Sequence, residues 1–241
     1  LFKEIELRAQ GYNDKRSIDQ LHFGGGTPTF LNNEQMSSLM NKLAKHFNLS
    51  ESQDRDFSIE IDPRELEENT LAHLKKIGFN RVSLGVQDVD PAVQKAVNRV
   101  QPLEMTKATL DQARNLDFKS INIDLIYGLP LQNREGFQKT LQHIIELSPD
   151  RISVFNYAHL PERFMPQRRI QTEDLPSPET KLGMLQDSIQ MLTQAGYIYI
   201  GMDHFAKPND SLAQAQQAGK LHRNFQGYTT HPDCDLVALG V

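Results

Sequence analysis

Cysteine is nearly missing from this sequence. Cys234 is the single cysteine among 241 residues, so the chain cannot form an internal disulfide or build a cysteine metal cluster by itself. A protein without disulfides is typical of a reducing compartment. The sequence therefore predicts a cytoplasmic location.

The sequence also lacks an excess of positive charge and any long apolar run. Its 26 basic and 31 acidic residues give a formal net charge of −5, which argues against a nucleic-acid partner held on a basic face. No apolar run approaches the ~18 residues of a membrane span, so no membrane partner is expected. With 38% apolar and 24% charged residues, the composition excludes general disorder.

Short apolar runs alternate with segments of helical periodicity along the chain. The runs are often apolar on both faces, which is typical of parallel strands covered by helices. The predicted strands are Gln20–Phe23, Phe57–Ile61, Arg81–Val86, Ser120–Ile126, Arg151–Asn156 and Tyr197–Gly201. The predicted helices run from asparagine caps at 32–33 to Phe47, over Thr70–Ile77 with Gly78 at the end, over about 103–116 and 134–147, and from Ser177-Pro178 to near Gly196.

Six strand–helix steps of this kind predict a parallel α/β sheet with right-handed connections. A closed eight-stranded barrel usually needs ~250 residues, so an incomplete or open barrel fits this length better. The chain opens within a helical pattern at Leu1 and Ile5, and residues 236–241 have the pattern of an unfinished buried strand. We therefore expect a piece of a longer protein, with its chemistry at the carboxyl ends of the strands.

Two acidic residues stand within otherwise apolar strands. Glu60 in SIEI and Asp124 in NIDL each bring a carboxylate that is costly to bury without a partner. Arg64, Arg81, or a ligand amine or hydroxyl could pair with Glu60. Together the two acids predict a ligand with amines and hydroxyls at one end.

Further ligand-binding groups follow the predicted strands. The glycines at 24–26 would let backbone N–H groups approach a carboxylate or phosphate closely, although a tight turn uses glycine for the same reason. Gln87 offers an amide, and Arg99 offers a guanidinium fork for a carboxylate.

Other polar residues give weaker indications. Four histidine and aspartate residues have side chains that suit zinc or iron, but their spacing along the sequence does not support a metal site. These residues are His159, His204, His222 and Asp203. Three arginines are interpreted as a solvated face and as candidates for binding acidic substrate groups: these are Arg163, Arg168 and Arg169. Cys234 stands between two aspartates, a poor setting for a thiolate.

Taken together, the motifs at the strand ends are specific. In chain order they are HFGGGTP, SIEIDPRE, SLGVQD with NR downstream, NIDLIYGLP, SVFNYAHLP, GMDHFA and HRNFQGYTT. With this set the sequence resembles the radical S-adenosylmethionine (radical SAM) enzymes over essentially its whole length. GGGTP alone indicates that superfamily, whereas FNYAHLP and NFQGYTT resemble its oxygen-independent coproporphyrinogen III oxidases of haem biosynthesis.

The resemblance implies an α/β fold, namely a partial parallel (β/α)₆ barrel of the radical SAM type. It implies S-adenosylmethionine, with two molecules per enzyme, and a [4Fe–4S] cluster on a CxxxCxxC loop. A 5′-deoxyadenosyl radical would take a hydrogen from each of two propionates of coproporphyrinogen III, which lose CO₂ and become the vinyl groups of protoporphyrinogen IX. The implied partners are this substrate and an unidentified electron donor.

Nine positions match cofactor-binding residues of the family, and no catalytic residue is assigned. Gly25, Gly26 and Thr27 match the S-adenosylmethionine glycine motif, and Glu60 matches an acid that holds its ribose or amine. The positions that match the surroundings of a second S-adenosylmethionine are Gln87, Arg99, Asp124 and Ala158, with Gln226 near the same cavity.

The chain departs from the family in one respect, because it contains no CxxxCxxC motif and Cys234 does not replace it. The resemblance implies that residues 1–241 form a truncated radical SAM core domain, without its first strand and cluster loop and without a C-terminal helical domain. We expect this piece alone to hold no cluster and to turn over no substrate. Two other interpretations stay open: a haem chaperone of the same superfamily, and a phosphate-binding barrel isomerase or lyase.

Overall fold

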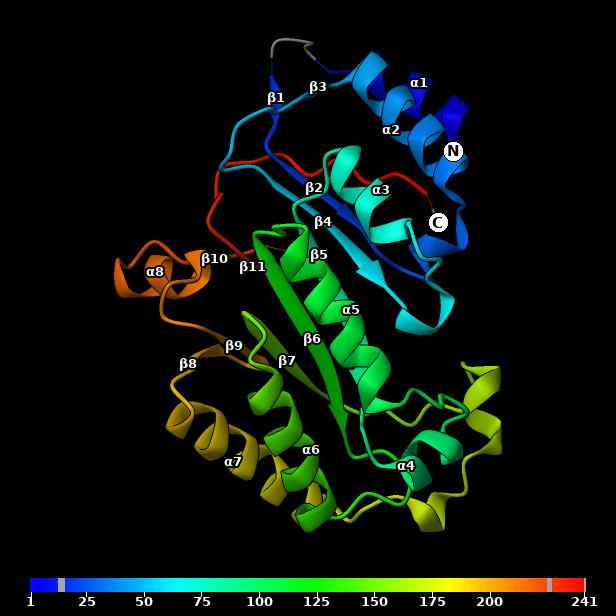
Figure 1. Cartoon of the computed structure of the whole chain (residues 1–241), viewed down its shortest axis with the longest axis vertical. Helices are drawn as coiled ribbons and strands as arrows, with labels where there is room; N and C mark the ends of the chain where they lie inside the picture. The colour runs from blue at the N-terminus through cyan, green and yellow to red at the C-terminus, as the bar shows by residue number, and fades with distance from the viewer. Residues whose placement is uncertain (13–15, 225–226, 241) are drawn as a thin grey trace.

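The computed structural model describes residues 1–12, 16–224 and 227–240. A seven-stranded sheet runs through its centre in the order β2-β4-β5-β6-β7-β9-β8 (Figure 1). In that order the strands are Gln20–Phe23, Asp56–Ile61, Arg81–Gln87, Ser120–Tyr127, Arg151–Asn156, His204–Ala206 and Ile198–Gly201. The first five are parallel neighbours. The parallel α/β prediction is confirmed, and these five strands lie within a residue of their predicted bounds.

The sixth predicted strand departs from the simple parallel pattern. It contains β8, but β9 lies between β8 and β7 and is antiparallel to both. Gly201 has φ +139° and Met202 has φ +51°, so the chain reverses directly after β8 and returns as β9. In the described part of the chain β2 and β8 are the two edges of the sheet, which is therefore open, as a partial barrel requires.

Helices cover one face of this sheet, and in Figure 1 α5 and α6 lie in front of the strands, with α7 beside α6. The helices are α1 Phe2–Ala9, α2 Asn33–His46, α3 Thr70–Lys76, α4 Pro91–Ala96, α5 Leu103–Asn115, α6 Arg134–Leu147, α7 Pro178–Gln194 and α8 Ser211–Gln217. Asn32 and Gln35 form a reciprocal capping box at the start of α2. Ser177 accepts a hydrogen bond from the N–H of Thr180 at the start of α7. Gly78 follows α3 with φ +112°, as predicted for a glycine that ends a helix.

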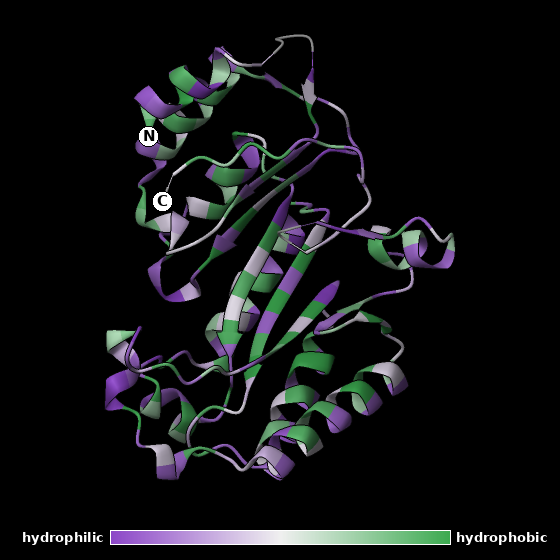
Figure 2. Cartoon of the chain, turned by 180° about the vertical axis from the view of Figure 1, so that it is seen from behind, coloured by the Kyte–Doolittle hydropathy of each residue, from purple (hydrophilic) through white to green (hydrophobic). Residues whose placement is uncertain are grey.

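Residues of the central strands alternate between two faces. On the helix-covered face, Ile59, Leu84 and Ile123 are each 0% exposed, and burial of each such side chain contributes about 1.5–3 kcal/mol. Many of the alternate positions are polar, namely Ser58, Glu60, Ser83, Asn122, Asp124 and Ser153, whereas Ile126 and Phe155 are apolar residues at such positions. Figure 2 shows this alternation along the strands from the side without helices. The prediction that the strands are apolar on both faces is therefore wrong, because helices cover only one face.

Two-residue ribbons and the chain ends surround the sheet. The ribbons pair β1 (Ser17–Ile18) with β3 (Asn48–Leu49), and β10 (His222–Arg223) with β11 (Tyr228–Thr229). The two ends of the described chain lie near each other beside α1 in both views (Figures 1 and 2). In the described residues no helix has the length and apolarity that a membrane crossing requires.

The C-terminal segment does not form the buried strand that its pattern predicts. Residues 236–240 have no regular secondary structure, and Leu236 is 51% exposed. The N–H of Gly240 donates to the carboxylate of Glu4 at 3.1 Å. The strand prediction is wrong for these residues, because the segment bonds to a side chain of α1 instead of to a neighbouring strand. Val241 lies outside the described residues.

Candidate functional site

Polar side chains gather on the uncovered face of the sheet, toward the carboxyl ends of β4, β5 and β6. Asp124 accepts hydrogen bonds from the Ser83 hydroxyl and from Asn122 Nδ2, each at 2.7 Å, and the Ser153 hydroxyl donates to Asn122 Oδ1 at 3.3 Å. Burial raises the pKa of Asp124 despite these bonds, and the nearby charge of Glu60 raises it further. The two intruding acids predicted from the sequence therefore share one site.

Glu60 lies beside His22 of β2. Its Oε1 atom is 3.3 Å from His22 Nε2, and His22 Nδ1 is 2.8 Å from the Ser58 hydroxyl. Sequence analysis missed His22, although the alternation along QLHF was a signal that could have found it. The register of β2 with β4 places His22 directly opposite Ser58, and thus on the polar face.

Neither arginine suggested by the sequence pairs with Glu60. Arg64 binds Asp62, with 2.6 Å between Nη2 and Oδ2, and Arg81 binds Asp56 at 2.5 Å. Arg81 begins β5 and Glu60 lies near the end of the parallel strand β4, so the two side chains are at different ends of the sheet. Arg64 lies beyond β4, in a 3₁₀ turn capped by the Asp62 side chain.

Gly24 lets the chain pass the Glu60–His22 pair. A Cβ atom at Gly24 would lie 2.6 Å from His22 Nε2 and 2.8 Å from Glu60 Oε1. Contacts that short require the pair to move, so glycine is needed here for close packing of the loop on these two side chains.

The next three residues face open space. Gly25 has φ +103°, a conformation that side chains rarely adopt. Cβ atoms at Gly25 and Gly26 would meet nothing within 4 Å. Thr27 is exposed and precedes the 3₁₀ turn Pro28–Phe30. A ligand can therefore reach this loop from the polar face.

Gln87 and Arg99 meet above Gly85, the residue of β5 that pairs with Asp124. A Cβ atom at Gly85 would lie 2.9 Å from Gln87 Nε2 and 3.2 Å from Arg99 Nη2. Arg99 donates to the Gly85 carbonyl at 2.6 Å and to Asp62 at 3.0 Å. Gln87 Oε1 and Arg99 Nε are buried, and no described residue bonds to them. One acceptor and one donor are therefore left without a protein partner beside Gly85, and buried polar atoms of this kind call for a specific explanation, which a ligand bound next to them would supply.

Electrostatics around Arg99 favour a fixed ion pair. Burial lowers the pKa of Arg99, while the Asp62 carboxylate raises it. Burial also acts to raise the pKa of Asp62, but hydrogen bonds from Arg64 and the charge of Arg99 hold that pKa below its ordinary value. Asp62 therefore stays ionised and keeps Arg99 beside Gln87.

The remaining predicted positions are less closely joined to this group. Ala158 is exposed beyond β7, and its carbonyl accepts from Gln167 Nε2 at 3.0 Å, so it can offer a ligand little besides backbone and a methyl group. Gln226 lies outside the described residues. Arg163, Arg168 and Arg169 are exposed, as their interpretation as a solvated face requires.

Metal-binding side chains do not converge. Within residues 1–12, 16–224 and 227–240 no three histidine, cysteine, aspartate or glutamate side chains form a group that could hold a metal ion. Cys234 is exposed. The weak metal indication from four histidine and aspartate residues thus has no support in the described part of the chain.

A cavity of about 140 Å³ lies beside His204 of β9. The rings of Phe155 and Tyr228 lie 5.9 and 5.6 Å from the His204 ring, both edge to face. Burial lowers the pKa of His204, and its Nδ1 atom is buried without a hydrogen-bond partner among the described residues, 3.9 Å from Asp203 Oδ1. His204 pairs with Ser153, so this aromatic cavity adjoins the Asp124 group.

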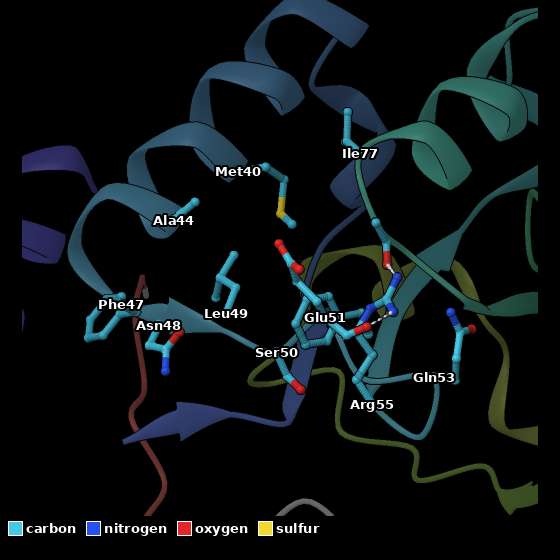
Figure 3. Close-up of a pocket in the computed structure, with 12 residues that line it drawn as sticks. Met40, Ala44, Phe47, Asn48, Leu49, Ser50, Glu51, Gln53, Arg55 and Ile77 are labelled. Atoms are coloured by element: carbon cyan, nitrogen blue, oxygen red, sulfur yellow. Dashed lines mark hydrogen bonds between the residues drawn. The ribbon is translucent and has the colours of Figure 1, made fainter. Parts of the chain in front are cut away.

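A larger cavity, of about 560 Å³, lies away from these residues. Figure 3 shows Met40 and Leu49 on its apolar side and Arg55 on its polar side. Arg55 donates to the Gly78 carbonyl and lies over the Phe57 ring. Phe57 is at the beginning of β4, so this cavity is at the amino end of the sheet. Because folds of this kind bind substrates at the carboxyl end, we do not assign the active site to it.

Comparison with known proteins places this geometry in a family. Oxygen-independent coproporphyrinogen III oxidase of Pseudomonas aeruginosa is 58% identical over 241 residues, which are 100% of this chain and 52% of that protein. The protein of the same name from Synechocystis is 47% identical over 239 residues, 99% of this chain and 51% of that protein. The chain thus spans about half the length of the curated relatives that it matches.

A solved structure matches the whole fold. Coproporphyrinogen III oxidase from Escherichia coli, described as a radical SAM enzyme, superposes with a TM-score of 0.95 at 55% identity, over 100% of this chain and 55% of that chain. Residues 2–144, more than half of the chain, match the family model of the radical SAM superfamily. The chain therefore belongs to the radical SAM superfamily.

Proposed function

We propose that the protein is an oxygen-independent coproporphyrinogen III oxidase and that this chain supplies its S-adenosylmethionine-binding core. Whole-chain similarity to oxidases of that name supports the proposal. The observation that carries it is the polar face, where Glu60, Gln87 and Asp124 lie toward the carboxyl ends of adjacent strands and the Arg99 side chain reaches the Gly85 carbonyl. Residues 1–241 form one core domain in this proposal, and the cluster loop and a C-terminal helical domain belong to other parts of the protein.

The polar face suits S-adenosylmethionine, which carries an amine, a carboxylate and ribose hydroxyls. Glu60 and Asp124 offer carboxylates to amine and hydroxyl donors. The guanidinium of Arg99 can receive a carboxylate, and the amide of Gln87 can bond to a donor or to an acceptor. The other proposed contacts, around one or two cofactor molecules, are Gly25, Gly26, Thr27, Ala158 and Gln226.

The described residues do not fit an iron–sulfur cluster. Cys234 is a single exposed cysteine, and the described ranges hold no convergent set of metal ligands. We therefore propose that the [4Fe–4S] ligands lie outside this chain, and we assign none of its residues to electron transfer. S-adenosylmethionine bound at such a cluster supplies the hydrogen-abstracting chemistry.

The residues of this chain bind and orient the reacting groups. Asp124 is fixed by Ser83 and Asn122, so it presents its remaining oxygen lone pairs in one direction. The rings of Phe155 and Tyr228 beside His204 offer an apolar wall for the pyrrole rings and methylene bridges of the substrate. Two propionates of coproporphyrinogen III, held at this end of the sheet, would each lose one hydrogen atom to the radical derived from S-adenosylmethionine, and then CO₂ and one electron to a one-electron acceptor, to become vinyl groups. An unidentified electron donor in the cytoplasm completes the proposed system.

Turnover by the complete gene product tests this proposal. The protein is reconstituted anaerobically with iron and sulfide and supplied with dithionite, S-adenosylmethionine and coproporphyrinogen III. We expect mass spectrometry to detect decarboxylated product together with 5′-deoxyadenosine. Asp124→Asn should reduce both, and Arg8→Gln, at an exposed position of α1, should match the wild type. A protein that forms neither product but binds haem tightly is a chaperone of the same superfamily, and the proposal is then wrong.

A further inference from the structure

The turn after β5 is held by buried polar side chains that lie behind the proposed cofactor contacts. Gln87 ends β5 with φ +68°, and the pairing register with β6 shifts between Gly85 and Gln87. Positive φ is uncommon and strained for a residue other than glycine, so surrounding contacts must hold this conformation. The buried polar residues around the turn are Asp88, Gln94, Gln101, Thr106, Gln132 and Thr140.

Asp88 anchors the chain directly after Gln87. It is 1% exposed, and its carboxylate accepts hydrogen bonds from the Thr140 hydroxyl at 2.6 Å, from Gln132 Nε2 at 2.5 Å and from the Asp90 N–H at 2.9 Å. Thr140 belongs to α6, and Gln132 belongs to the loop before it. These bonds therefore tie the end of β5 to the next strand–helix unit.

Gln94 and Gln101 extend the same network to Arg99. Gln94 Nε2 donates to the carbonyls of Asp88 and Gln101 at 2.9 and 2.7 Å, and Gln94 Oε1 accepts from the Gln101 N–H at 2.9 Å. Gln101 in turn donates to the Thr106 hydroxyl at 2.9 Å and accepts from Arg99 Nη2 at 3.3 Å. An unbroken series of hydrogen-bonding groups thus joins α6 to the guanidinium of Arg99.

We propose that Asp88, Gln94 and Gln101 are positioning residues, which fix the side chains of Gln87 and Arg99 beside Gly85 in the arrangement that S-adenosylmethionine would contact. The inference rests on the proposed function, because it takes these two side chains as ligand contacts. Nη1 and Nη2 of Arg99 are bonded to protein acceptors, whereas Nε has no partner. A pair of side chains ordered in advance binds its ligand without the entropy loss of ordering them on binding.

Gln101 offers the sharpest test, because its side chain touches Arg99 and its removal leaves Gln94 bonded to the backbone. Gln101→Met keeps the length of the side chain but removes the acceptor for Arg99. Gln101→Glu restores that acceptor, and the Thr106 hydroxyl can donate to the new carboxylate. We expect Gln101→Met to lower the affinity of one S-adenosylmethionine site about 10-fold. Removing the hydrogen-bond partner of a metal-binding residue commonly has an effect of that size on affinity. Gln101→Glu should stay within about 2-fold of the wild type, since it keeps a charge-assisted bond to Arg99.

The measurement is anaerobic titration calorimetry of the complete gene product with S-adenosylmethionine, together with thermal midpoints. In steady state, Gln101→Met should raise KM for S-adenosylmethionine with little change in kcat, as expected when binding alone is lost. Tyr197→Phe is the matched control, because it removes a buried hydrogen bond to the Pro149 carbonyl away from the site. It should lower the thermal midpoint and leave the affinity unchanged.

Two results would overturn the positioning role. One is wild-type affinity in Gln101→Met, and the other is equal weakening in Gln101→Met and Gln101→Glu, which indicates a general structural effect. Failure of the wild-type protein to bind S-adenosylmethionine at all is a different outcome, because it refutes the proposed function itself and the inference with it.

Discussion

Replacing Arg81 with methionine should destabilise the fold strongly. Arg81 is 6% exposed, and its guanidinium lies 2.5 Å from Asp56 and 3.9 Å from Asp210. Burial and the charge of Arg151 lower the pKa of Arg81, while the two aspartates raise it. The buried charge is therefore stable only as part of this group, which joins the amino ends of β4 and β5 to the residue that caps α8.

The size of the decrease in the free energy of unfolding depends on which buried charge loses its partner. Removing one partner of a buried pair costs about 3–5 kcal/mol, because the other charge stays buried without compensation. Asp210 keeps Arg151 at 2.8 Å, but Asp56, whose side chain is 19% exposed, loses its arginine. We therefore expect Arg81→Met to lower the free energy of unfolding by about 3 kcal/mol, the lower end of that range. Adding Asp56→Leu should recover part of the loss.

Urea unfolding of the 241-residue chain, followed by circular dichroism, measures this effect. The control is Arg16→Met, which breaks the pair with Asp235, where the two side chains are 55% and 67% exposed. That loss should be clearly smaller, since solvent screens an exposed pair. Equal losses in the two variants, or a deeper loss when Asp56→Leu is added to Arg81→Met, would refute the reasoning.

Two further predictions concern the glycine loop and the response to acid. Gly24→Ala puts a Cβ 2.6 Å from His22 Nε2; displacement of the Glu60–His22 pair should weaken S-adenosylmethionine binding by calorimetry about 10-fold, and unchanged affinity would contradict the placement of Glu60 in the site. The pKa of Asp62 is lowered from 3.8, so its stabilisation is present above that pH and is lost as the pH falls through the lowered pKa. Asp62→Asn should therefore be less stable than the wild type at neutral pH and converge with it in acid, whereas a constant difference in urea midpoint would contradict that sign.

The sequence carries enough information to find Glu60 and Asp124, because an acid within an apolar strand is costly and therefore conspicuous. It also carries a signal for Ser83, Asn122 and His22, because polar and apolar residues alternate along most of their strands. The prediction that strands are often apolar on both faces overlooked this alternation. Once the alternation is recognised, one polar face of the sheet follows from the pleat alone.

Pairings between distant residues could not be predicted in the same way. The partner of Glu60 depends on the register between β2 and β4, and a single sequence does not specify that register. Likewise, the unpartnered atoms of Gln87 and Arg99 arise from side-chain packing over Gly85. The strand β9 was missed because three residues, His204–Ala206, are too few to show a periodicity.

Transfer of a substrate hydrogen is the most direct test of the central claim that this polar face serves S-adenosylmethionine chemistry on coproporphyrinogen III. The complete gene product is given coproporphyrinogen III deuterated in its propionate side chains, under anaerobic conditions with reductant. The account predicts that deuterium appears in 5′-deoxyadenosine as vinyl product forms, and that Asp124→Asn reduces both signals together. Vinyl product formed without deuterium in 5′-deoxyadenosine would contradict it.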